Sequence, residues 1–263
     1  MKQKKKYSKG IVYIPFLFVA IIILFFLYSR ENSHYIEEQN KNYAADSARQ
    51  TVEHIEREFQ EAVSKVSAYA YFIGEGLSTP TITLEMLKNM EEVSGFDAFR
   101  FADKNGVNWA TNGRTSNATD RDFYINGMKG EKGVSVLLNS RITNEAMVGF
   151  YAPVYYKGDI IGVLRGAYWA DEYLKDMLSV SYFGQKAGVF LCTIDGMVIA
   201  SSGEEKYEKN LLDSFIDSNV IDKTVYQETK NIFEHGGEGS FLCSSGSKID
   251  NICVVHFPES EYV

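Results

Sequence analysis

The nineteen residues from Gly10 to Tyr28 constrain this chain more than any other segment, because none of them is charged. A helix rises about 1.5 Å per residue, so this run is long enough to span roughly the ~30 Å hydrocarbon core of a bilayer. We therefore expect residues 10–28 to form a transmembrane helix. The alternative is a cleavable signal peptide, which has a shorter apolar core and small residues at its cleavage site. Here the run ends in Leu27, Tyr28, Ser29 and Arg30.

Charge is distributed unevenly along the chain. Six of the 27 basic residues precede residue 31 and none of the 35 acidic residues does, so residues 31–263 carry 21 basic and 35 acidic residues, a net charge of −14. The basic cluster before the apolar run predicts a cytoplasmic tail over residues 1–9 and an extracytoplasmic body. An acidic body lacks the basic face that nucleic acid or anionic lipid would require, so we exclude nucleic-acid binding.

A long amphipathic segment follows the apolar run. Apolar residues recur three or four positions apart, and neither proline nor glycine occurs between Glu31 and Ile73. This pattern predicts one stalk helix over residues 31–76. Its polar first half is expected to form a stalk that makes a homodimer contact, and its second half to pack on a sheet. The apolar stripe consists of Val52, Ile55, Phe59, Val63, Val66 and Ala70.

The rest of the chain has the periodicity of strands. A short helix is expected at residues 84–93, and a second helical patch begins at Ala170. Between them, runs rich in β-branched and aromatic residues alternate with turn sequences such as DKNG and YKGD. The predicted fold class is therefore α+β, with an antiparallel sheet following a long N-terminal helix. The expected strands cover residues 96–102, 106–111, 133–138, 146–156 and 159–169.

The same pattern occurs twice. Residues 99–111 (FRFADKNGVNWAT) and 190–202 (FLCTIDGMVIASS) each read as a strand, a turn containing Asp and Gly, and a return strand. We therefore expect two successive subdomains of one type. The second would continue through a helical stretch at 204–233 and strands at 237–246 and 251–257. We expect this second subdomain to be incomplete and the chain to be a fragment of a longer receptor.

Three cysteines lie in the last third, at Cys192, Cys243 and Cys253, without the spacing of a metal or redox site. Cys243 and Cys253 flank a polar turn, so one interpretation is a disulfide across a hairpin. The other is that all three are small buried thiols. No metal and no cofactor is expected.

Two segments, DRDFYINGMKGEKGVS at 120–135 and VGFYAPVYYKGDIIGVL at 148–164, complete the order of motifs. In this order the chain resembles the double Cache family of extracytoplasmic sensor domains, two PAS-like subdomains on one long helix. The resemblance implies a membrane-distal subdomain at 77–175 and a membrane-proximal one at 176–263. It also implies a non-enzymatic sensor of a bacterial signal-transduction receptor. The output would be a diguanylate cyclase (GGDEF), or alternatively a chemoreceptor or histidine kinase.

The resemblance also implies a ligand site in the distal subdomain. Relatives that bind amino acids carry an R-x-W-Y stretch and an aspartate near the last strand. Arg121 and Tyr124 match the arginine and tyrosine, and Phe123 replaces the tryptophan. Ala167 stands at the position of the aspartate, so the usual partner of an ammonium group is missing. The expected ligand is a small carboxylate or an amino-acid-like molecule.

The residue chemistry supports an anion site, because the planar fork of arginine donates two parallel hydrogen bonds to a carboxylate. Strand alternation puts Arg165 on the same face as Ala167, which would bring two arginines to one cavity and suit a dicarboxylate. The alternatives are a surface Arg121 paired with a neighbouring aspartate, and an Arg165 that emerges into solvent at the sheet edge. The aromatic residues expected to wall the cavity are Phe99, Trp109 and Tyr151.

Catalytic patterns are missing from the sequence. It contains no GxSxG or HExxH motif, and its four histidines are scattered. A membrane-anchored extracellular hydrolase is therefore only the second class of function. A protein-binding adhesin or stalk is the third, and it would need an exposed apolar patch rather than a cavity.

Overall fold

The computed structural model describes residues 10–76, 82–137, 146–175, 177–179, 181–182, 185–186, 188–202, 210–245 and 248–256. Among these residues, no helix combines the length and the apolar character needed to cross a membrane. The expected cytoplasmic tail, residues 1–9, and the side chains of residues 10–17 lie outside the described part.

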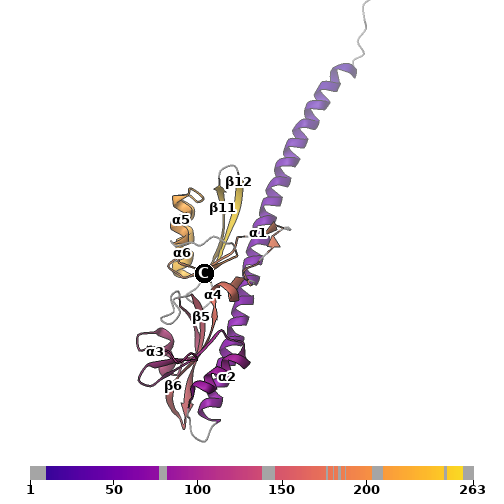
Figure 1. Cartoon of the computed structure of the whole chain (residues 1–263). Helices are drawn as coiled ribbons and strands as arrows, with labels where there is room; N and C mark the ends of the chain where they lie inside the picture. Colours follow the sequence, from indigo (N-terminus) through magenta and orange to yellow (C-terminus); the bar gives the residue numbers. More distant parts are fainter. Residues whose placement is uncertain are drawn as a thin grey trace, which may run out of the picture.

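One helix, α1 (Gly10–Gly74), runs along the whole molecule and joins the expected membrane helix and stalk helix without a break (Figure 1). The main part of each subdomain lies on one side of it. Its predicted stripe is confirmed, since Ile55, Phe59 and Val66 are buried against the rest of the protein. At its end the helix approaches the distal sheet closely, since a Cβ at Gly74 would collide with the carbonyl oxygen of Tyr155.

The distal subdomain is a six-stranded antiparallel sheet in the order β3-β2-β1-β6-β5-β4. The strands predicted from the sequence are all present. The additional short strand β3 lies outside the expected strands, because its three polar residues carry no alternation signal. The bounds are β1 (Ala98–Asp103), β2 (Val107–Ala110), β3 (Thr115–Asn117), β4 (Gly133–Leu137), β5 (Met147–Tyr156) and β6 (Asp159–Trp169).

Two layers of helix cover this sheet (Figure 1). The apolar core joins one face to α1 and α2 (Leu84–Ser94), and in it Phe59 of α1 meets Phe150 of β5 edge-on, with ring centroids 5.6 Å apart. The short helix α3 (Asp122–Met128) covers the opposite face. The sheet is therefore a single layer between the long helix and α3.

The proximal subdomain repeats the hairpin of the distal one. The β1–β2 turn closes with the amide of Gly106 donating to the carbonyl of Asp103 at 2.9 Å, and the β9–β10 turn with Gly196 donating to Thr193 at 2.8 Å. Both glycines have positive φ, as this turn requires. The predicted internal repeat is confirmed in these hairpins. The strands are β9 (Phe190–Cys192) and β10 (Val198–Ser201), after the short pair β7 (Ser181–Tyr182) and β8 (Gln185–Lys186).

Two helices and a second hairpin complete the proximal subdomain. The predicted helical stretch is divided into α5 (Leu211–Asp217) and α6 (Lys223–His235), each capped by the side chain of the preceding residue. The hairpin consists of β11 (Glu238–Ser245) and β12 (Lys248–Val255). In the described residues the two hairpins do not join into one sheet.

The two subdomains share a core. The short helix α4 (Ala170–Lys175) buries Ala170 and Leu174 in the same apolar cluster as Leu191 and Ile199 of the proximal hairpin. The predicted boundary between residues 175 and 176 therefore does not separate two independent apolar cores.

The disulfide interpretation is wrong for Cys253. The β11–β12 register places Cys253 opposite Ser240, and its thiol donates to the Ser240 hydroxyl at 3.3 Å. The side chain of Cys243 lies outside the described part of the structure. Cys192 and Cys253 are both free thiols.

Candidate functional site

The face of the distal sheet under α3 carries two buried arginines side by side. Arg165 on β6 pairs in register with Arg100 on β1 and with Tyr151 on β5. Arg165 is only 2% exposed and Arg100 only 5%. The interpretation of Arg165 as a solvent-exposed edge residue is therefore wrong, since β6 is an interior strand of the sheet.

Strand alternation explains why these residues meet. Val163, Arg165 and Ala167 project toward α3, while Leu164 projects into the core on the α1 side. The helix α3 places a ring on top of Arg165, whose guanidinium carbon lies 5.1 Å from the centroid of the Phe123 ring. This is a cation–π contact in a desolvated setting.

Gly149 makes room for the Arg165 guanidinium. It lies on β5 opposite Ala167, and a Cβ at this position would collide with the Nε, Cζ and Nη2 atoms of Arg165. Ser135 of β4 pairs with Gly149 and shares its face. The arginine therefore extends across β5 toward β4 over a position without a side chain.

The buried polar atoms without a partner are concentrated on this face. In the described part of the chain, five buried side-chain atoms have no hydrogen-bond partner: Arg100 Nε, Arg165 Nε and Nη2, Asn108 Oδ1 and Ser135 Oγ. Register and alternation put all of them on the α3 side, since Asn108 pairs with Ala102 and Ser135 pairs with Gly149. Buried polar groups are nearly always paired, so this concentration needs an explanation. We call the set Arg100, Arg165, Arg121, Asn108 and Ser135 the arginine face.

Electrostatics on the arginine face are dominated by like charges. Burial, and then the charges of Arg100 and Arg121, lower the pKa of Arg165 to about 9, which leaves it charged at neutral pH. Burial also lowers the pKa of Arg100, against a smaller opposing effect of Glu91. The Glu91 carboxylate already accepts hydrogen bonds from the Phe99 amide at 2.8 Å and the Thr111 hydroxyl at 2.9 Å.

The two tyrosines near the arginine face already have hydrogen-bond partners. Burial raises the pKa of Tyr151, and a hydrogen bond from Asn126 of α3 opposes that effect. Burial raises the pKa of Tyr124 as well, while its hydroxyl is engaged by the backbone of Gly106. Tyr151 therefore faces Arg165 across the strands, and Tyr124 points toward the β1–β2 turn.

The structure brings most of the predicted site residues together. Arg121 is the half-buried N-cap residue of α3, and its charge acts on Arg165. Phe123 packs against Tyr151 and lies over Arg165. Ala167 lies next to Arg165 on the same face, between Ala98 and Gly149 in neighbouring strands.

Phe99 and Trp109 do not belong to this face. Phe99 packs edge-on against Tyr69 of α1, with ring centroids 5.5 Å apart, and Trp109 lies against Phe101 at 6.2 Å. Both alternate away from Arg100, so they line the helix core and not the predicted cavity. Sequence reasoning missed Arg100, Asn108 and Ser135, whose only signal is the pairing of strands far apart in the chain.

A groove lies on the opposite side of the sheet. It is shallow, has a volume of about 520 Å³ and runs between α1 and α2, lined by apolar residues that include Tyr69, Phe72 and Met90. It has no charged side chain in its lining. The polar groups that could recognise a small molecule are therefore on the arginine face.

Comparisons with known proteins place the chain by its fold. No protein-family model and no curated protein matches the sequence. Among solved structures, the ligand-binding domain of the Pseudomonas fluorescens chemoreceptor CtaA, in complex with L-serine, matches with a TM-score of 0.60 at 15% identity, covering 81% of this chain and 88% of that one.

Two further solved structures give the same result. The ligand-binding domain of the Campylobacter jejuni chemoreceptor Tlp3 with L-norvaline matches with a TM-score of 0.60 at 13% identity, covering 86% and 88% of the two chains. The ligand-binding domain of Mlp24 with asparagine gives 0.61 at 17% identity, covering 86% and 91%. With its long N-terminal helix and its PAS-like antiparallel sheet under α3, the chain has the double Cache fold of bacterial sensor domains.

Proposed function

We propose that this chain is the extracytoplasmic sensing module of a bacterial signal-transduction receptor and that it binds a small carboxylate or amino-acid-like molecule at the arginine face. The observation that carries this proposal is the set of five buried, unpartnered polar atoms on one face of the distal sheet. A ligand that accepts hydrogen bonds would satisfy them. The solved neighbours bound to L-serine, L-norvaline and asparagine support a ligand of this size.

Two consecutive residues of β5 connect the arginine face to the long helix. Gly149 lies beneath the Arg165 guanidinium, and the next residue, Phe150, packs against Phe59 of α1. A ligand shifts such an arrangement only if it binds one conformation better than another. Binding that moves Arg165 relative to β5 would therefore change how β5 packs on α1.

Anchoring and dimerisation belong to the same proposal. The uncharged run at residues 10–28 would hold the module in the cell membrane, with the body outside the cytoplasm. The stalk would pair with a second copy, and its exposed Tyr35, Ile36 and Tyr43 are suited to such a contact. The output would be a diguanylate cyclase, with a chemoreceptor or histidine kinase as the alternative.

A ligand screen tests the sensing function. The full chain in detergent would be melted with a panel of metabolites, because a ligand that binds only the folded state raises the free energy of unfolding by about 2.7 kcal/mol at a hundred times its Kd. We expect stabilisation by small carboxylates or amino-acid-like compounds. It should be lost in Arg165→Met and kept in Arg57→Met, which removes an exposed arginine of α1. Absence of stabilisation across the whole panel contradicts the sensing function.

A further inference from the structure

We propose that the arginine face selects a small dianion that has no ammonium group, held by Arg100, Arg165 and Arg121 together. This inference rests on the proposed function, because it assumes that the ligand binds at this face. It assigns Arg100, a residue of β1, to ligand recognition and narrows the class of ligand.

The balance of charge on the arginine face is the first reason to expect a dianion. The charges that act on Arg165 are those of Arg100 and Arg121, both cations. The one described acid that acts on Arg100, Glu91, is already held by a backbone amide and a hydroxyl. Asp122 and Glu131 act on the neighbouring Tyr151 and not on Arg165. Buried charges in proteins are paired, so three cations beside so few acids form an arrangement that an anion completes. A zwitterion brings no net charge, whereas a dianion offsets two of the three cations.

The positions of the three arginines are the second reason to expect a dianion. Arg100 and Arg165 are register partners on adjacent antiparallel strands, which puts their Cα atoms roughly 4.5–5.5 Å apart. Both side chains therefore start from neighbouring points on the arginine face; the Arg165 guanidinium extends over Gly149 of β5, and Arg121 lies at the start of α3. Each fork matches one carboxylate, or one edge of a phosphate. A ligand with two anionic groups, or with one doubly charged group, can therefore bind more than one of these guanidinium groups.

The neighbourhood of Arg165 also disfavours an ammonium group. Along β6 the next residue on this face is Ala167, and its partners on the adjacent strands are Ala98 and Gly149, so no acidic side chain stands there. The free acceptors on the face, Asn108 Oδ1 and Ser135 Oγ, are neutral. They suit a ligand hydroxyl, because an ammonium beside them would be repelled by three guanidinium groups.

Matched ligands test the inference by calorimetry on the full chain in detergent. L-malate and L-aspartate differ by a hydroxyl in place of the ammonium, and succinate and butyrate differ by one carboxylate. Inorganic phosphate forms a separate arm that distinguishes a phosphate dianion from a dicarboxylate. We expect malate and succinate, or phosphate, to bind at least tenfold more tightly than aspartate and butyrate.

Variants of the two strand arginines test the assignment of residues. Arg100→Met and Arg165→Met should each weaken dianion binding by roughly two orders of magnitude, as loss of one member of a buried charge pair does. Without ligand, both should melt at the same temperature as the wild type or higher, since an unpaired buried charge is removed. A purely structural arginine would instead lower the melting temperature. Arg57→Met is the control and should change neither measurement.

The outcomes separate this inference from the proposed function. If L-aspartate or L-serine binds as tightly as the amine-free dianions, the ligand class is wrong and the sensing function stands. If no dianion binds at millimolar concentration, the inference is overturned. The sensing function fails only if no compound of the wider metabolite panel stabilises the protein either. If Arg100→Met binds dianions normally, Arg100 has no part in recognition.

Discussion

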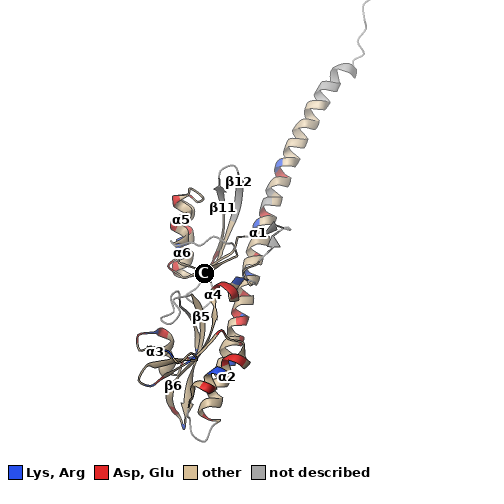
Figure 2. Ribbon diagram, in the orientation of Figure 1, with Lys and Arg blue, Asp and Glu red and all other residues tan. Residues whose placement is uncertain are grey.

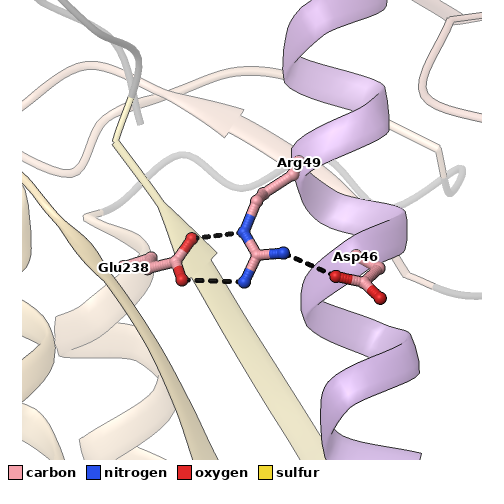
Figure 3. A network of polar contacts seen from close by, with 3 residues as sticks. All are labelled: Asp46, Arg49 and Glu238. Carbon is pink, nitrogen blue, oxygen red and sulfur yellow. Dashed lines mark hydrogen bonds and ion pairs between the residues drawn. The ribbon is translucent and has the colours of Figure 1, made fainter.

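Arg49 of α1 forms a bidentate ion pair with Glu238 of β11, which lies 189 positions further along the chain (Figure 3). The Nε–Oε2 distance is 2.6 Å and the Nη2–Oε1 distance is 2.8 Å, and Asp46 contacts the remaining nitrogen at 2.5 Å. The side chains of Arg49 and Glu238 are 45% and 49% exposed. This pair joins the proximal hairpin to the long helix on the solvent side.

We expect acid to loosen that connection. The hydrogen bond from Arg49 lowers the pKa of Glu238 below its ordinary value. A depressed carboxyl pKa contributes stability above the unfolded value, about 4.3, and that stability is lost as the pH falls through the folded pKa. The protection of the β11 amides, relative to the intrinsic exchange rate at each pH, should therefore fall below about pH 4 in the wild type. In Glu238→Gln it should already be lower at pH 7.

Because both side chains are half-exposed, the effect should be local, small and weakened by salt. The matched control is Glu234→Gln, which removes a similarly exposed ion pair with Lys230 within α6. Equal exchange in β11 for the wild type and Glu238→Gln at neutral pH would contradict a role for the pair in holding the hairpin.

A double-mutant cycle tests how closely Gly149 and Arg165 are coupled. Gly149→Ala should destabilise the protein by about 1–3 kcal/mol, the usual effect of overpacking, because the new methyl group occupies the place of the guanidinium. In an Arg165→Met background the same change should be nearly neutral, since the thioether chain is smaller and flexible. Denaturant unfolding of the four proteins measures the coupling energy. Additive effects would show that the guanidinium lies elsewhere.

Much of the fold follows from local pattern. The stripe from Ile55 to Ala70 has helical spacing, and the two Asp- and Gly-containing turns at 103–106 and 193–196 specify hairpins through glycine at positive φ. Each signal lies within a few residues of the element it predicts. Figure 2 shows acidic residues in α2 and α4 beside the long helix, and none of the described Asp and Glu residues is buried.

The arginine face could not be read from the sequence in the same way. Arg100 and Arg165 meet only because β1 pairs with β6, and their pairing depends on the register of two strands whose arginines are 65 positions apart in the chain. A slip of one residue would have turned Arg165 into the core. Phe99 and Trp109, expected at the ligand site, alternate to the α1 side instead. The helix α3 has seven residues, too few for a helical period to emerge.

Cys192 should not react with alkylating reagents in the folded protein. Burial raises the pKa of its thiol to about 12, so almost no thiolate exists at pH 8. Only the thiolate reacts with alkylating reagents. Brief iodoacetamide treatment followed by mass spectrometry should leave Cys192 unmodified in the native protein and modify it fully in denaturant. Rapid native modification would show that the proximal core around Leu211 and Ile232 opens readily.

The last prediction concerns transmission along the stalk. Single cysteines at the exposed positions Glu38 and Asn42, in a chain whose native cysteines are replaced, report how two copies of α1 lie against each other. If the ligand changes how β5 packs on α1, the rate of disulfide cross-linking should change when a saturating dianion is added. The same ligand should have no effect in the Arg165→Met background, which separates binding from a direct effect on oxidation. Because coupling between two sites requires a differential affinity for two states, unchanged rates at both positions with ligand demonstrably bound would rule out the stalk as the route of the signal.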